Sequence, residues 1–404
     1  MKKIRDIFYV LLLLCMTMSC ENWLDVDPKT EIKSELMFQS VSGFKDALMG
    51  VYLTLRDPEL YGKEATWGFV DAIGQQTDIQ DQATTYYNAS RYNYSQTSSV
   101  SDALWAKAFN AIVNLNNMLE NLDEQQNLFT PATYGVLKGE ALGLRAFLHF
   151  DLVRLFGWGN LAKKPENLEK LCMPYMTKYD KVLTKQLTVG EVLAHIEEDL
   201  LVSIELLNNN DPYGLAPKSD DYDLPNEDKF FDNREKRFNY WAAVCTLTRV
   251  YMWMGRKGEA LTLATSFIDR GGRTSWIDSY TIDAYYEKDR DLTFSKEHVF
   301  ALDVAELFEN IKHYIDPNAN KPNRNADLLH HSSERANKLF EAVNGVSTDY
   351  RYKRWYNKVN DYFDGWAFYK YWEVEEYSYG SVLPLIRKPE MYYMAAECLL
   401  ETGN

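Results

Sequence analysis

The stretch 243–264, AVCTLTRVYMWMGRKGEALTLA, gives the most specific indication of the fold. Apolar residues from Leu247 to Tyr251 recur at helical spacing before Gly255, and a second apolar helical pattern that includes Ala260 follows after a very short turn. Small residues at such positions allow two helices to pack closely. The stretch therefore predicts a helix hairpin of the tetratricopeptide type, within a mainly α fold class.

The last residues resemble the first helix of this hairpin. The segment 391–404, MYYMAAECLLETGN, places Gly403 where Gly255 stands, and no second helix follows it in the sequence. A repeat helix cannot bury its apolar face alone. We therefore expect the C-terminal part to be truncated, with a natural chain that continues past Asn404; a C-terminal helix docked on the body is the alternative.

Other helices are indicated by their caps and by their apolar spacing. Candidate N-caps stand at Ser42, Ser101 and Thr130, the last followed by proline at the first helical position. Thr188 and Glu191 have the spacing of a capping box. These signals predict long helices, each with one apolar face.

Four long segments rich in turn formers separate the helices. They cover residues 74–101, 208–237, 271–296 and 349–379, and three of them are crowded with Tyr, Trp or Phe. Loops of this length in a compact domain usually carry function or pack as irregular lids. The sequence therefore predicts a helix-hairpin scaffold joined to a loop-rich, irregular half.

The composition limits the classes of partner. The 404 residues include 44 Lys and Arg against 59 Asp and Glu, a net charge of −15, so a broad surface for nucleic acid is not expected. Hydrophobic residues make up 46% and charged residues 25%, which is ordinary for a soluble globular protein. The aromatic content is high and Tyr dominates it, with 28 Tyr, 19 Phe and 10 Trp, so many rings can be half exposed.

The N-terminus has the pattern of a bacterial lipoprotein signal. Residues 2–5 carry three positive charges, residues 7–14 are apolar, and Ser19 precedes Cys20. We expect a signal peptide over 1–19 and acyl chains on Cys20, which would anchor the protein to a membrane. An ordinary secreted protein, with an incidental cysteine, is the alternative.

Five stretches resemble the SusD/RagB family of outer-membrane nutrient-binding lipoproteins, and they occur in the family's order. They are CENWLDVDP at 20–28, LWAKAFNAIVNLN at 104–116, KGEALGLRAFLHFDLVRLFG at 138–157, RVYMWMGR at 249–256 and PLIRKPEMY at 384–392. Two features depart from the family pattern. The chain ends where members continue through further helices, and Thr17 stands where a lipoprotein signal usually has Leu.

The resemblance implies a single domain over 20–404, with an N-terminal portion at 20–237 and an incomplete C-terminal portion at 238–404. It implies four tetratricopeptide-type helix pairs and a ligand site in the irregular half. A protein of this family is expected on the cell surface, lipid-anchored in the outer membrane. There it would bind an oligosaccharide or polysaccharide and deliver it to a TonB-dependent, SusC-like transporter. No catalysis and no cofactor are implied.

A glycan site needs exposed flat rings for sugar C–H faces and polar groups for the hydroxyl rim. The family's binding residues vary widely, so the candidates come from the aromatic loops, and packing remains the alternative for each ring. The candidate ligand-binding residues are Trp67, Asp78, Tyr86, Tyr87, Asn88, Tyr92, Trp276, Tyr285 and Tyr286.

Other chemistries have weaker support. The acidic residues Asp220, Asp221 and Asp223 lie in a solvated loop, where the raised pKa of a glycosidase acid is not expected. His330 and His331 are interpreted as exposed helical residues that point apart, so no metal site is predicted.

The segment 316–327 loosely imitates a calcium loop, but Lys321 stands where the turn requires Gly. We therefore predict no enzyme and no metal. The alternative function is a helical-repeat scaffold lipoprotein that binds only proteins or peptides. The long aromatic loops and the lipoprotein signal favour glycan binding.

Overall fold

The computed structural model describes residues 34–79, 82, 84–271, 274–316, 327–360, 363–372 and 379–402. The predicted signal peptide, Cys20, most of the calcium-like loop and Gly403 lie outside these residues. The predictions made for them, including the domain boundaries and the continuation past Asn404, stay predictions.

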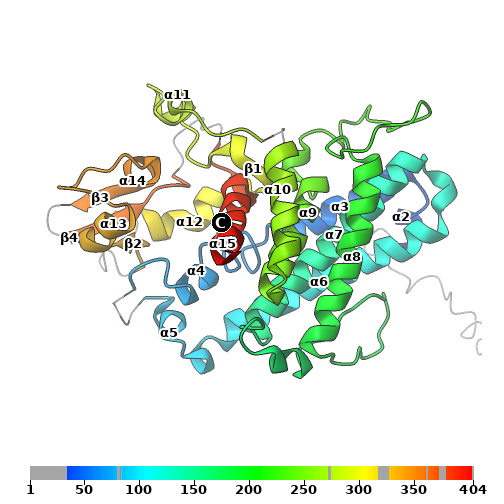
Figure 1. Ribbon diagram of the computed structural model, residues 1–404, viewed down its shortest axis with the longest axis horizontal. Coiled ribbons are helices and arrows are strands. Elements are labelled where there is room, and N and C mark those ends of the chain that lie inside the picture. The colour runs from blue at the N-terminus through cyan, green and yellow to red at the C-terminus, as the bar shows by residue number, and fades with distance from the viewer. Residues whose placement is uncertain are drawn as a thin grey trace, which may run out of the picture.

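The described chain is mainly helical (Figure 1). The α-helices are α2 (Ser34–Met37), α3 (Val41–Leu55), α4 (Phe69–Ile73), α5 (Tyr87–Ser90), α6 (Ser98–Glu124), α7 (Pro131–Phe156), α8 (Val189–Asn210), α9 (Tyr240–Met254), α10 (Lys257–Arg270), α11 (Ser279–Ile282), α12 (Leu307–Ile315), α13 (Ser333–Leu339), α14 (Tyr350–Arg354) and α15 (Lys388–Thr402). Short 3-10 helices lie at η2 (Tyr94–Gln96), η3 (Gln126–Leu128), η4 (Pro165–Glu169), η5 (Arg234–Lys236), η6 (Glu287–Asp289) and η7 (Ser295–Glu297).

The strands form two small antiparallel sheets. They are β1 (His298–Asp303), β2 (His330–His331), β3 (Tyr356–Asn360), β4 (Phe363–Phe368) and β5 (Val382–Arg387). β1 pairs with β5, so that His298 lies opposite Arg387. The second sheet has the order β2-β4-β3. The segment 349–379 was expected to be a loop, and the structure places α14 and two strands in it.

The long helices pack in succession. α3 contacts α6, α6 contacts α7, and the series continues through α8, α9 and α10 to α15. Figure 1 shows these helices gathered on one side of the molecule, with α4, α5, α11 to α14 and the β2-β4-β3 sheet on the other. The prediction of a mainly α helix-hairpin scaffold with a loop-rich half is confirmed.

The hairpin predicted at 243–264 consists of α9 and α10. Asn239 caps α9 by accepting a hydrogen bond from the amide of Ala242 at 3.0 Å. Gly255 ends α9 in the left-handed region, at a φ of 76°. A Cβ atom at this position would lie 2.9 Å from the Cβ of Ala162. Both the backbone conformation and the close approach therefore require glycine here.

Two of the predicted caps are correct and two are misplaced. Thr188 and Glu191 form the capping box at the start of α8, and Thr130 caps α7 ahead of a proline. α3 is capped by Ser40 rather than by Ser42, and α6 begins at Ser98, before Ser101. Serine-rich approaches to a helix offer several hydroxyls, and the entry path of the chain selects among them.

α7 is buried along most of its length and carries paired charges into the core. Glu140 accepts hydrogen bonds from Arg234 at 2.6 Å and from Arg237 at 2.7 Å. Arg145 binds Asp199 with two bonds, of 2.7 and 2.8 Å. Buried charges are tolerated only when they are paired. These residues of the 138–157 stretch therefore join α7 to α8 and to the segment before α9.

The adjacent histidines were interpreted wrongly. His330 and His331 lie in strand β2 rather than in a helix, and His331 is buried, with its Nε2 3.0 Å from the hydroxyl of Tyr356. The β2–β4 pairing, which the sequence did not indicate, draws His331 inward. Within the described ranges, no group of three His, Cys, Asp or Glu side chains could hold a metal ion.

None of the helices in the described part of the chain is both long and apolar enough to cross a membrane.

Candidate functional site

Two of the nominated rings belong to the core. Trp67 is 3% exposed and its indole donates a hydrogen bond to the carbonyl of Gly62, and Tyr86 is 2% exposed with its hydroxyl on Glu64. Both rings pack against Tyr314 of α12, at centroid distances of 5.4 and 5.8 Å. The prediction that these two residues present exposed faces to a ligand is wrong, because packing against α12 covers them.

Asp78 joins the first loop to the second sheet. It accepts a 2.7 Å hydrogen bond from Arg335 and another from the amide of Ser332. Burial by itself would raise the pKa of Asp78, but these bonds lower it below its usual range. The two oxygens of Asp78 already accept hydrogen bonds from Arg335 and Ser332. Asp78 therefore holds the first loop against the second sheet.

The rest of the first loop is more open. Tyr87 is half-buried under Arg91, and the side-chain oxygen of Asn88 accepts a hydrogen bond from Asn93. Tyr92 is 54% exposed, with its ring 6.3 Å from that of Tyr94. Of the residues predicted in this loop, Tyr92 therefore offers the most open ring.

Trp276 lines a cleft in the irregular half, which we call the aromatic cleft. The cleft has a volume of about 390 Å³, and its lining includes Trp276, Asp349, Arg351, Arg387, Tyr392 and Tyr393. The Trp276 ring is 49% exposed and lies 5.1 Å from the ring of Tyr392, while Tyr393 beside it is 67% exposed. Segments far apart in the sequence thus bring three accessible rings to one place.

Two ion pairs form the polar wall of the aromatic cleft. Arg351 contacts Asp349 at 2.7 Å, and Arg387 contacts Glu297 at 2.7 Å. Burial would raise the pKa of Asp349, but its hydrogen bonds from Arg351 hold it below the usual range. The wall therefore presents guanidinium donors at fixed positions beside carboxylate acceptors.

A second cleft of about 200 Å³ is lined by Tyr369, Trp372, Arg290, Lys353, Arg354 and Glu287. The rings of Tyr369 and Trp372 are stacked, with centroids 4.6 Å apart. Arg354 is held by Asp283 at 2.7 Å and Arg290 by Glu287 at 2.9 Å. This cleft repeats the combination of aromatic rings with arginine.

The two clefts flank one seam. Both take residues from α14 or its N-terminal approach and from the segment 292–294. The indole of Trp355 donates a 2.7 Å hydrogen bond to the carbonyl of Leu292, and its ring lies 5.1 Å from that of Phe294. This seam, in which Leu292 and Phe294 are buried, holds the two clefts in position.

The nominated pair Tyr285 and Tyr286 is exposed, at 88% and 62%, and the two rings contact each other edge to face. Neither residue lines either cleft within the described part of the chain. The acidic residues Asp220, Asp221 and Asp223 are exposed in their loop. Neither the tyrosine pair nor the acidic residues line the aromatic cleft.

Sequence reasoning missed Tyr392 and Tyr393, since both were assigned to a repeat helix, and it missed Arg351 and Arg387. One signal was available. Tyr393 is a bulky ring on the exposed face of α15, where a repeat helix usually has a polar residue. The two arginines carried no local signal.

Comparisons with known proteins agree on one family. A family model described as "Starch-binding associating with outer membrane" matches residues 22–219. The SusD-like protein P25 of Formosa agariphila is 28% identical over 190 residues, which cover 45% of this chain and 36% of the relative. SusD-like protein P38 of the same organism is 26% identical over 300 residues, covering 70% and 50%. The chain thus spans half or less of the length of these curated relatives.

Solved structures share the fold. A SusD superfamily protein from Bacteroides thetaiotaomicron matches with a TM-score of 0.67 at 19% identity, covering 90% of this chain and 77% of that one. A SusD-like carbohydrate binding protein from Bacteroides vulgatus matches with a TM-score of 0.64 at 17% identity, covering 90% and 72%.

A helical-repeat scaffold with a loop-rich half is the architecture that these structures have in common with this chain. The chain belongs to the SusD/RagB family, as the five sequence stretches predicted.

Proposed function

We propose that this protein is a cell-surface glycan-binding lipoprotein, which captures an oligosaccharide or polysaccharide in the aromatic cleft. The observation that carries the proposal is the meeting of Trp276, Tyr392 and Tyr393 beside two arginine–carboxylate pairs. The family description, starch binding in association with the outer membrane, supports the same class of ligand.

The geometry of the aromatic cleft suits a sugar chain. A pyranose ring has C–H faces that stack on aromatic rings and a rim of hydroxyls that both donate and accept hydrogen bonds. The exposed rings of Trp276 and Tyr393 supply stacking surface, and the Arg351–Asp349 pair supplies donors and acceptors at fixed positions. Pre-positioned groups lose little entropy on binding.

The carboxylates of the aromatic cleft are suited to binding a glycan rather than to cleaving it. Glycoside hydrolysis requires one carboxyl group that is protonated near neutral pH. In the aromatic cleft Asp349 has a lowered pKa, and Glu297 is paired with Arg387. Asp349 is therefore better suited to accepting hydrogen bonds from sugar hydroxyls than to donating a proton.

The captured glycan would be delivered to a TonB-dependent, SusC-like transporter in the same outer membrane. Acyl chains on Cys20 would hold the protein there, because two or more chains make release slow. The N-terminal signal pattern and the family's outer-membrane association support this placement. Copurification of the transporter, together with loss of membrane attachment in Cys20→Ala, tests this part of the proposal.

Affinity electrophoresis against a panel of plant, host and microbial polysaccharides tests the glycan site. We expect one glycan class to retard residues 21–404, and a Trp276→Ala, Tyr392→Ala double variant to bind about tenfold more weakly. Tyr280→Ala is the matched control, since this ring is 88% exposed and lies outside the lining of the aromatic cleft.

Equal retardation of the double variant and wild type would place the glycan elsewhere, for example at Tyr92. If no glycan retards the folded protein, the alternative gains support. In that case the helical scaffold would bind only protein or peptide partners.

A further inference from the structure

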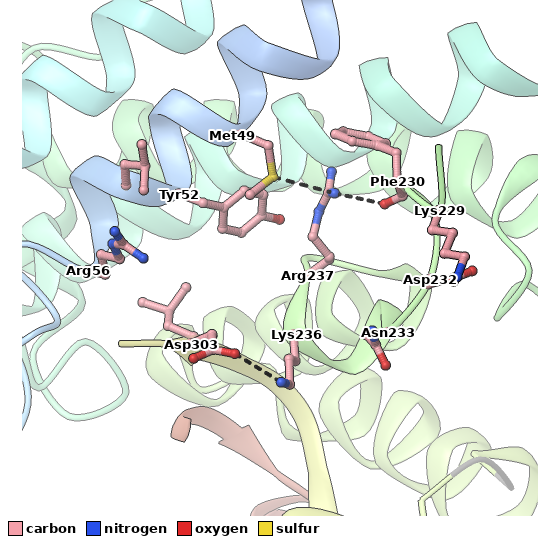
Figure 2. Close-up of a pocket in the computed structure, with 12 residues that line it drawn as sticks. Met49, Tyr52, Arg56, Lys229, Phe230, Asp232, Asn233, Lys236, Arg237 and Asp303 are labelled. Carbon is pink, nitrogen blue, oxygen red and sulfur yellow. Dashed lines mark hydrogen bonds and ion pairs between the residues drawn. The ribbon is translucent and has the colours of Figure 1, made fainter. Parts of the chain in front are cut away.

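A separate cavity lies between the helical scaffold and the first sheet. It is bordered by the end of α3, by the segment 229–237 and by the end of β1, and its volume is about 410 Å³ (Figure 2). A cavity of this size suits a small organic molecule. It shares no lining residue with the aromatic cleft or the second cleft among the described residues.

Apolar and cationic side chains share the lining of this cavity. Met49, Leu53 and Leu302 contribute apolar surface. The cationic groups come from Arg56, Lys229, Lys236 and Arg237, against the acids Asp232 and Asp303. An excess of cations is unexpected in a chain whose net charge is −15, and it favours an anionic occupant.

Arg237 is the buried member of this set. Its Nε donates to Glu140, and its guanidinium lies over the ring of Phe230 at 4.1 Å and over that of Tyr52 at 5.0 Å. The side chain is only 7% exposed, yet its Nη2 has no hydrogen-bond partner within the described part of the chain. A buried guanidinium nitrogen without a partner is costly, because it has lost its hydrogen bonds to water and gained none from the protein.

Two further cations border the cavity. Arg56 and Lys229 are exposed, and neither forms an ion pair with another residue in the described ranges. Figure 2 shows them on opposite sides of the view, with Arg237 between them. Of the remaining charges, Lys236 is neutralised by Asp303 at 3.0 Å. Arg56 and Lys229 are therefore available to a ligand.

The segment that carries these residues has an unusual backbone. Lys229 and Asn233 both adopt left-handed conformations, with φ values of 58° and 51°. Such conformations cost energy in residues other than glycine and often occur at ligand sites. Asn tolerates this region well, but Lys does not. The strain at Lys229 thus coincides with the cavity wall.

We propose that this cavity binds a small organic carboxylate with an apolar body. The carboxylate would lie among Arg237, Arg56 and Lys229, and the apolar body would pack on Met49, Leu53 and Leu302. Arginine pairs well with carboxylates because its donors form a planar fork. The site is separate from the glycan site and does not depend on the proposed glycan function.

Saturation-transfer difference NMR with phenylacetate, phenylacetamide and acetate tests this proposal on the purified protein. Phenylacetate carries both the ring and the charge, the amide lacks the charge, and acetate lacks the ring. We expect phenylacetate to bind with a Kd of about 1 mM or lower, and the other two to bind about tenfold more weakly.

Variants locate the binding. An Arg56→Gln, Lys229→Gln double variant removes the two unpaired cations and should weaken phenylacetate binding about tenfold. Leu53→Trp, which fills the mouth of the cavity, should have the same effect without changing charge. Lys181→Gln with Lys185→Gln is the matched control, since both lysines are exposed and lie outside the cavity lining.

The proposal is supported if phenylacetate binding is lost in the first two variants and retained in the control. It is overturned if phenylacetate does not bind wild type, or if phenylacetamide binds equally well. Equal weakening in the control would also overturn it, because binding would then follow net charge alone. Circular dichroism confirms that each variant is folded.

Discussion

Glu140 is the carboxylate at the centre of a buried network of charged side chains. It is fully buried, and it accepts hydrogen bonds from Arg234, Arg237 and the hydroxyl of Tyr52. Burial would raise the pKa of Glu140, but the two arginines lower it below its usual range. The carboxylate therefore stays ionised in the core.

Replacing Glu140 with Gln should destabilise the protein by about 3–5 kcal/mol, because Arg237 would lose its counter-charge inside the core and Arg234 would keep only Asp211. Urea unfolding measures this change. Glu205→Gln is the control, since Glu205 is exposed, and it should alter stability by less than about 0.5 kcal/mol. Similar changes in both variants would contradict a special role for the Glu140 network.

Three buried histidines make stability depend on pH. Burial lowers the pKa of His149 to about 3, of His298 to about 3 and of His331 to about 4. In the unfolded chain a histidine takes up a proton near pH 6.5. Each of these histidines therefore supports folding above about pH 6.5, and this support is lost as the pH falls toward its folded pKa.

We expect each of them to contribute a slope of about 1.4 kcal/mol per pH unit within that window. The variant His331→Gln should lose one such slope between about pH 6 and pH 5. Unfolding free energies measured at several pH values test this, with the exposed His195→Gln as the control. An unchanged slope in His331→Gln would show that His331 takes up its proton equally in both states.

At the scale of elements, the α9–α10 hairpin contains two glycines in different surroundings. Gly255 has a φ of 76° and a close neighbour in Ala162. Gly258, three residues later in α10, has open space where a Cβ would be placed. One position requires glycine, and the other does not.

Gly255→Ala should therefore destabilise the protein by about 1–3 kcal/mol. The matched change Gly258→Ala should stabilise it by about 0.5–1 kcal/mol, because alanine favours the helix. Thermal melting of both variants compares them directly. A Tm that shifts in the same direction for both would contradict the geometry of the turn.

At the scale of the whole molecule, the described residues form two hydrophobic clusters of very different size. The large cluster runs through the helical scaffold, while a small one under the three-stranded sheet is made of Ala336, Phe340, Tyr352 and Tyr356. A small cluster buries little apolar surface, so the β2-β4-β3 sheet should open more easily than α7. The Arg335–Asp78 pair links this sheet to the rest of the protein.

Asp78→Ala should accelerate amide exchange in β2 and α13 about fivefold, corresponding to roughly 1 kcal/mol of lost local stability. Exchange in α7 should be unchanged. Hydrogen–deuterium exchange with mass spectrometry measures both regions in one experiment. Asp46→Ala is the control, since Asp46 is exposed on α3. Uniform acceleration across the chain would mean that the sheet is not a separate unit.

Local patterns predicted the scaffold well. Helical periodicity, the capping box at Thr188 and the turn at Gly255 depend on residues a few positions apart, so the sequence displays them directly. The strands in 349–379 were missed because they are short and aromatic, which leaves no clear alternation of polar and apolar residues. β4 pairs with its neighbour β3 and also with β2, more than thirty residues away.

The site was predicted only in part. Trp276 and Trp67 are both tryptophans in turn-rich surroundings, yet one is half exposed in a cleft and the other packs against Tyr314. No spacing rule distinguishes them, because α12 lies more than two hundred residues from Trp67 in the sequence.

The family, the helical class and the division into a scaffold and an irregular half could all be predicted from the sequence, since they follow from local periodicity and short motifs. Which rings face solvent, and the contact between Trp276 and Tyr392, became known only from the folded arrangement. The same is true of the position of Arg237 beside a cavity. These properties arise from contacts between distant segments, whose formation depends on the packing of the whole chain.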